Sequence, residues 1–184
     1  MGPIETERLR LRRYTKDDVA LMHALMSDKR VMAHHPFVFD WERSVKGVDQ
    51  VLATDDRYGY SLLAVELKAG GYIGHVGLLH WDDVDAREDV EVAYYLLPQY
   101  WGKGYAAEAA RACRDWAFEH LSIDRVVSFI VTENSPSIAV AQRNGMTRLK
   151  RLEQNRFGRP IYVYGITREQ WSARSNGFDR SPAS

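Results

Sequence analysis

The chain of 184 residues has very little cysteine and no excess of charge of either sign. Its single cysteine, Cys113, excludes an internal disulfide and cannot build a cysteine-rich zinc site. The 25 basic residues balance the 25 acidic residues, so no overall field favours nucleic acid or an anionic membrane. Neither partner is therefore expected.

Long apolar runs are missing as well. No segment has the length that a membrane span needs, and the charged stretch from Glu5 to Arg13 does not resemble a signal peptide. A chain of 184 residues can form one domain with its own core. We expect a cytoplasmic protein with a single domain over residues 1–172. The polar residues 173–184 show no periodicity and are expected to form a disordered tail.

The sequence does contain a mixture of short strand and helix patterns. Alternation predicts strands at 90–96 and 125–131, and another at 8–13, which has few apolar residues and is expected at a sheet edge. Two hairpins are predicted, one over 60–81 and one over 146–167. Helical spacing occurs at 15–26, 41–53 and 106–121, and a further helix is predicted from its N-cap, Ser135, to Gly145.

The order of these elements predicts an α+β fold. A strand, two helices and three strands precede a helix, a strand, another helix and two strands. Only the segment from Val90 to Val131 has the strand–helix–strand order of a parallel crossover. A ligand is expected at the carboxyl end of the first strand in such a unit.

The turn between this first strand and its helix contains Gly102, Lys103 and Gly104. A helix start offers unpaired N–H groups and the positive end of the helix dipole, which together bind phosphate oxygens. Glycine would let a pyrophosphate approach the backbone, although a tight turn without a ligand is an equally good explanation. A Walker A loop is absent. The match to Gly-x-Gly-x-x-Ala only weakly indicates a dinucleotide fold, because that fold needs several crossover units.

The segments YYLLPQYWGKGYAAEA and VTENSPSIAVAQRNGM resemble the GNAT superfamily of N-acetyltransferases, in its RimJ/RimL-like branch. The resemblance extends from about Glu7 to Trp171. It implies a mixed, mostly antiparallel sheet that splays at the parallel crossover and is flanked by helices. It also implies acetyl-CoA as the co-substrate and direct transfer to the amine of a protein N-terminus or a small molecule. A homodimer is left open.

The resemblance implies a set of cofactor-binding residues, which are Leu96, Trp101, Gly102, Lys103, Gly104, Tyr105, Ala106 and Asn134. Trp101 stands where the family has Gln or Arg. The backbone of Leu96 would bond the pantetheine amides, and the side-chain amide of Asn134 would reach the pantetheine arm. The alternatives are a core role for Leu96 and a loop role for Asn134, in which it bonds its own backbone.

Glu91 and Ser137 are the predicted catalytic residues. An amine is protonated at neutral pH and must lose a proton before it attacks a thioester. A carboxylate on the central strand could take that proton if burial raises its pKa. Ser137 stands where the RimL-like branch has a proposed general acid. The alternatives are an exposed strand glutamate and an early-helix serine that bonds the backbone.

Many GNAT enzymes have a tyrosine that protonates the leaving thiolate, and this sequence has Ala141 at that position. Ser137, or a tyrosine such as Tyr95 or Tyr162, would have to replace it. Alternatively, the thiolate leaves unaided, because a thiol is a fairly good leaving group.

His34, Phe37 and Trp41 are the candidates for lining the acceptor pocket, since this region shapes the pocket in the resembling family. Each could instead be a packing residue. The adjacent His34 and His35 do not share a face, so they make a poor metal pair and no metal is assigned. Two alternatives to an N-acetyltransferase stay open, a non-catalytic acyl-CoA-binding module and a nicotinamide-linked oxidoreductase.

Overall fold

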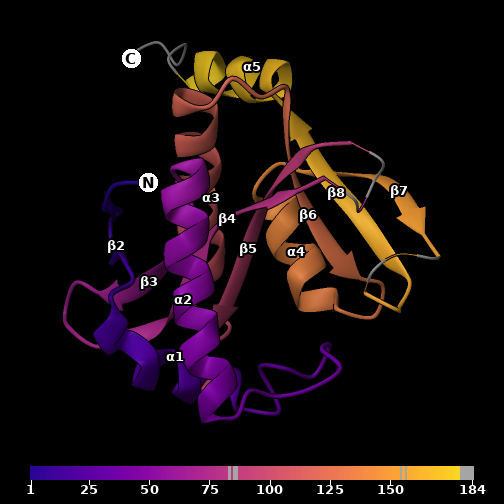
Figure 1. Cartoon of the computed structure of the whole chain (residues 1–184). Coiled ribbons are helices and arrows are strands. Elements are labelled where there is room, and N and C mark those ends of the chain that lie inside the picture. Colours follow the sequence, from indigo (N-terminus) through magenta and orange to yellow (C-terminus); the bar gives the residue numbers. More distant parts are fainter. Residues whose placement is uncertain (83, 85–86, 154, 156, 179–184) are drawn as a thin grey trace.

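The computed structural model describes all residues except 83, 85–86, 154, 156 and 179–184. The described strands form one eight-stranded sheet in the order β1-β2-β3-β4-β5-β6-β8-β7 (Figure 1). The strands are β1 (Ile4–Glu5), β2 (Leu9–Arg13), β3 (Leu62–Leu67), β4 (Tyr72–Trp81), β5 (Asp89–Leu96), β6 (Arg125–Val131), β7 (Thr147–Leu152) and β8 (Ile161–Thr167). The α-helices are α1 (Val19–Met26), α2 (Trp41–Tyr58), α3 (Tyr105–His120), α4 (Ser135–Arg143) and α5 (Arg168–Phe178), with short 3-10 helices at Lys16–Asp18 and Pro98–Tyr100.

Neighbouring strands of the sheet pair antiparallel, except for β5 and β6. These two are parallel and are joined through α3, which confirms the predicted α+β fold with a single parallel crossover. The hairpin between β3 and β4 also forms where the sequence predicts it, with Gly70 and Gly71 at positive φ in the turn.

The parallel pairing is very short. Only Val90 with Val126 and Glu91 with Val127 are in register between β5 and β6. Beyond these pairs β5 stays paired with β4 as far as Leu96, and β6 stays paired with β8. The two central strands therefore separate after Glu91 and leave a gap in the sheet toward their carboxyl ends.

The sheet divides the hydrophobic core into two layers. On one face, Val90 and Val92 of β5 pack with Ala110 and Cys113 of α3. On the other face, α1 and α2 form a smaller cluster with which Tyr95 of β5 is in contact. Figure 1 shows α2 in front of the sheet and α3 behind it. Successive residues of a strand face opposite sides, so Glu91 points away from α3, as Tyr95 does.

Two local predictions need correction. The strand expected at the sheet edge is β2. The edge strand is instead β1, whose Ile4 pairs with Leu11 of β2. This pairing and the complete burial of Leu9 and Leu11 make β2 a core strand despite its arginines. The N-cap of α4 is Asn134 and not Ser135, because the Asn134 side chain accepts the Ser137 amide.

The chain end differs from the expectation too. Residues 173–178, expected in the disordered tail, belong to α5, while the remainder of that tail lies outside the described residues. The helix is attached through Trp171, which stacks on Phe118 and donates from Nε1 to Asp115 at 2.8 Å. In the part of the chain that the structure describes, no helix is long and apolar enough to cross a membrane.

An ion pair closes the sheet at the start of the parallel pairing. Arg125 of β6 donates from Nε and Nη2 to the two carboxylate oxygens of Asp89 in β5, at 2.7 Å each. The Asp89 side chain is 1% exposed and that of Arg125 is 16% exposed. Little water screens the pair, so its loss should be costly.

We expect Asp89→Asn to lower the free energy of unfolding by about 3 kcal/mol, because it leaves a buried guanidinium without this counter-charge. Urea denaturation at neutral pH measures the change. The control is Glu153→Gln, which breaks the exposed Arg151–Glu153 pair and should cost at most about 1 kcal/mol. Equal losses in the two variants would contradict the role given to the buried pair.

Candidate active site

Glu91 lies at the point where β5 and β6 separate, and its carboxylate is bound on both sides. Oε1 accepts the Phe129 amide of β6 at 3.0 Å, and Oε2 accepts the indole Nε1–H of Trp81 at 2.7 Å. The residue is 7% exposed, so the alternative of an exposed strand glutamate is wrong. Burial raises the pKa of Glu91 from 4.5 to about 7, although the two hydrogen bonds oppose the rise.

An aromatic cluster includes Trp81, the side-chain donor to this carboxylate. The rings of Trp81, Phe129 and Phe157 contact one another in pairs, with centroids 5.6 to 6.4 Å apart. They come from the end of β4, from β6 and from the turn between β7 and β8. None of them was among the residues predicted for the site. The alternation in β6 could have indicated Phe129, which follows Val127, the parallel partner of Glu91, by two residues.

The start of α3 has the features expected of a phosphate site. Gly102 and Gly104 have φ of 74° and 83°, and Gly104 is the N-cap of the helix. The first helical amide to find a backbone acceptor is that of Glu108, which donates to Gly104 O at 3.1 Å. A Cβ on Gly102 would meet nothing within 4 Å, so the turn is open. Free amides in an open turn fit the pyrophosphate of acetyl-CoA.

Arg8 adds a cation to this turn that was not predicted. Its guanidinium donates to Lys103 O at 3.1 Å and lies 4.5 Å from the centre of the Tyr105 ring. Glu108 holds it through Nε at 2.7 Å. Arg8 and Lys103 are 95 residues apart in sequence. No local pattern could have shown that they share a turn.

Two of the predicted cofactor residues bind each other. The Trp101 indole donates to the backbone oxygen of Leu96 at 2.6 Å, while the residue is 49% exposed. Leu96 itself is 5% exposed and packs in the core on the α3 side of the sheet. Trp101 thus bonds the strand end rather than the phosphate turn. The other predicted members, Tyr105 and Ala106, form the first turn of α3.

Asn134 and Ser137 are neighbours at the start of α4. The Asn134 Oδ1 accepts the Ser137 amide at 3.2 Å, which is the local role that the sequence left open as an alternative. Tyr94 of β5 donates its hydroxyl proton to Ser137 O at 3.0 Å. This bond joins α4 to β5 beside the gap. Burial raises the pKa of Tyr94 above its ordinary value of 10.

The predicted acceptor residues Phe37 and Trp41 contact other aromatic side chains. Phe37 is 50% exposed and stacks on Phe39, and Trp41 is 55% exposed with its edge on His23. The connection from α1 to α2 reaches β5 through His35, whose Nε2 lies 2.8 Å from the Tyr95 hydroxyl. His34 precedes it, and its buried Nδ1 has no partner among the described residues.

The two tyrosines considered as acids lie on opposite faces. Tyr95 shares the face of Glu91, whereas Tyr162 pairs with Ile130 and points to the other face. No cluster of three or more potential metal ligands occurs within the described residues.

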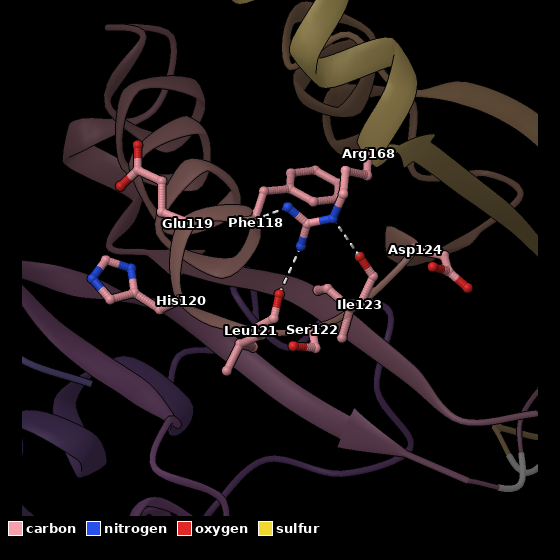
Figure 2. Close-up of a pocket in the computed structure, with 8 residues that line it drawn as sticks. All are labelled: Phe118, Glu119, His120, Leu121, Ser122, Ile123, Asp124 and Arg168. Carbon is pink, nitrogen blue, oxygen red and sulfur yellow. Dashed lines mark hydrogen bonds between the residues drawn. The ribbon is translucent and has the colours of Figure 1, made fainter.

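A pocket of about 440 Å³ lies at the carboxyl end of α3, away from the glycine turn. Figure 2 shows that Arg168 points into it. The guanidinium donates to the carbonyl oxygens of Phe118 and Leu121 at 2.7 Å and of Ile123 at 3.0 Å. These bonds satisfy the terminal carbonyls of α3 and tie α5 to it. We interpret Arg168 in this pocket as a structural cap of α3. We place the candidate active site at the gap between β5 and β6.

The model of the acetyltransferase (GNAT) domain matches residues 8–147. The chain therefore belongs to the GNAT acetyltransferase family, which confirms the resemblance seen in its motifs. It is an acetyltransferase, and the oxidoreductase alternative is set aside.

Individual relatives and solved structures are similar to this chain over most of its length. The Bacillus subtilis protein YkkB is 30% identical over 161 residues, which are 86% of this chain and 92% of that protein. An acetyltransferase structure from Agrobacterium tumefaciens is 31% identical with a TM-score of 0.77, covering 90% of this chain and 94% of its own. A GNAT acetyltransferase structure from Bacillus anthracis is 26% identical with a TM-score of 0.78, covering 91% and 99%.

The raised pKa of Glu91 predicts a pH-dependent stability difference. The folded chain holds the Glu91 proton more tightly than the unfolded chain, so this group lowers stability as pH rises from about 4.5 to about 7. Glu91→Gln removes that loss. Between pH 4 and pH 8, the free energy of unfolding of the variant should rise by up to about 3 kcal/mol relative to that of wild type. Urea denaturation of both proteins across this range measures it.

A constant difference in the free energy of unfolding between the two proteins does not affect the test. Such a difference is expected, because the NH₂ group of the Gln side chain meets one of the two donors at every pH. The test is how this difference in the free energy of unfolding changes with pH. Two stability curves that run parallel from pH 4 to pH 8 would show that Glu91 titrates like a solvated carboxyl.

Proposed function

We propose that the protein is an acetyl-CoA-dependent N-acetyltransferase of the RimJ/RimL-like branch. It transfers an acetyl group to a primary amine, of a protein N-terminus or a small molecule, by direct attack in a ternary complex. The observation that carries the proposal is the buried Glu91, whose pKa of about 7 suits a proton acceptor, at the gap between β5 and β6.

The cofactor half of the proposal is supported by the start of α3. The open amides and the left-handed Gly102 and Gly104 would hold the pyrophosphate, with Lys103 and Arg8 as nearby cations. The pantetheine arm would enter the gap between the strands. Two structures of the same fold carry such ligands, RimL in complex with coenzyme A and MccE in complex with acetyl-CoA and AMP. Their identities of 19% and 18% support the fold alone.

The Asn134 side chain fits this placement in a limited way. Its oxygen caps α4, so its NH₂ group is the part that would reach the pantetheine arm. Leu96 O already accepts the Trp101 indole. A pantetheine amide would therefore share that oxygen or displace the indole.

The chemical half of the proposal rests on Glu91. An acceptor amine arrives as an ammonium ion, and Glu91 takes its proton so that the free amine can attack the thioester carbonyl. A carboxyl with a pKa near 7 is ionised above neutral pH and is a stronger base than a solvated glutamate. The leaving thiolate takes a proton from Ser137 or departs unaided. Of the two tyrosines considered as acids, Tyr95 lies on the same face as Glu91 and is the one that could donate this proton instead.

Gly104→Val tests the cofactor half. A β-branched side chain would crowd the phosphate turn and strain a residue whose φ is 83°. We expect the affinity for coenzyme A to fall at least ~10-fold, or about 1.4 kcal/mol, as measured by calorimetry. The control is Gly59→Val at the end of α2, where φ is 77° and a Cβ would meet nothing within 4 Å. It imposes similar strain and should leave affinity unchanged.

Unchanged affinity in a folded Gly104→Val protein would move the phosphate away from α3. An equal loss in both glycine variants would attribute the effect to backbone strain instead.

Glu91→Gln tests the chemical half. Turnover should fall about 10²- to 10⁴-fold, as is usual when a general base is lost, while coenzyme A affinity changes little. In the wild type, kcat/KM should rise with pH through about 7 as Glu91 ionises, and the variant should lack this limb. The measurement is a pH profile with any amine that is turned over. Glu5→Gln, at a side chain that is 57% exposed, is the matched control. A wild-type profile in Glu91→Gln would remove Glu91 from the mechanism.

A further inference from the structure

The Glu91 carboxylate accepts one hydrogen bond from each neighbouring strand. The donor from β6 is the Phe129 amide, a backbone group that substitution of the side chain does not remove. The donor from β4 is the Trp81 indole, at 2.7 Å. Among the described residues Trp81 is the side chain that donates to Glu91, so it is the adjustable part of the arrangement.

The register of β4 and β5 explains how Trp81 reaches Glu91. Trp81 is opposite Asp89 and Leu79 is opposite Glu91, so the indole extends diagonally along one face. The ring is then fixed by edge contacts with Phe129 and Phe157, at centroid distances of 6.4 and 5.6 Å. A half-buried ring held on two sides keeps its N–H aimed at one oxygen.

We propose that Trp81 is the positioning residue of the candidate active site, holding the Glu91 carboxylate in one orientation at the gap between β5 and β6. This inference rests on the proposed function for its catalytic meaning, but not for its structural content. A hydrogen bond to a carboxylate stabilises the ionised form more than the protonated form. Trp81 therefore also limits how far burial can raise the pKa of Glu91, which otherwise would hold its proton at neutral pH.

Other titratable groups near Glu91 do not interfere with this effect. Tyr94 and Tyr95 feel the charge of Glu91, but burial keeps their pKa values above the ordinary value of 10. His35 bonds Tyr95, and burial, followed by the charges of His34 and Arg159, lowers its pKa below 6.5. The rings of Phe129 and Phe157 do not titrate. A transition near pH 7 at this site is assigned to Glu91 by its loss in Glu91→Gln.

The test replaces the indole while keeping an aromatic ring. Trp81→Phe removes the N–H donor, and the pKa of Glu91, followed by carbon NMR of its carboxyl group, should rise by about one unit. Glu91→Gln identifies the signal. Trp116→Phe, at an indole of α3 that stacks on His120, is the control and should leave the pKa near its wild-type value. The acid limb of kcat/KM should move to higher pH in Trp81→Phe by the same amount.

The outcomes separate this inference from the proposed function. An unchanged Glu91 pKa in folded Trp81→Phe overturns the positioning role. A raised pKa with an unmoved kcat/KM profile supports the positioning role and overturns Glu91 as the base. In the Glu91→Gln background, Trp81→Phe should have no further effect on kcat, because it acts through Glu91.

A measurement on the wild-type chain covers the case in which Trp81→Phe does not fold. Of the five tryptophans, one indole N–H signal in a nitrogen-labelled sample should titrate with a midpoint near the Glu91 pKa of about 7. That titration should vanish in Glu91→Gln. If every indole titration between pH 5 and 9 persists in Glu91→Gln, the inference is overturned without any change at Trp81.

Discussion

The two-residue parallel pairing between β5 and β6 is the constraint on which the candidate active site depends. When two central strands separate inside a protein, their backbone groups lose their ladder partners, and buried backbone groups must be paired. Side chains replace the ladder here. Ser128 donates its hydroxyl to Val92 O at 2.8 Å, and Glu91 accepts the Phe129 amide. The gap is stable because side chains form hydrogen bonds with the backbone groups at its edges. One of these side chains is Glu91, the proposed general base.

The crossover is closed at one end and open at the other. At the amino ends, the Asp89–Arg125 pair clamps β5 to β6 with almost no exposure of the carboxylate. At the carboxyl ends, the strands diverge beside Tyr94, whose hydroxyl holds the start of α4. The ionisation of the buried Glu91 lowers stability as pH rises from about 4.5 to about 7, and this cost accompanies its capacity as a base.

The two ends of α3 are treated in opposite ways. Arg168 satisfies the carbonyls at its carboxyl end, which makes that end structural. At the amino end, the turn around Gly104 leaves amides without backbone acceptors and places Arg8 and Lys103 beside them. A helix whose positive end alone is open suits an anionic ligand. Under the proposed function, this open end of α3 would hold the phosphate of acetyl-CoA at the end of the crossover where β5 and β6 separate.

Local patterns in the chain were sufficient to predict most strands and helices, the single crossover, the glycine turn before α3, and Glu91 as the candidate base. Which distant groups meet depends on the folded chain. The bonds from Arg8 to Lys103 and from His35 to Tyr95 follow from strand order and loop path. Periodicity reports which way a residue faces along its own element, but not which residue of another element faces it. The indole of Trp81 on Glu91 is therefore visible only once the register of β4 and β5 is known.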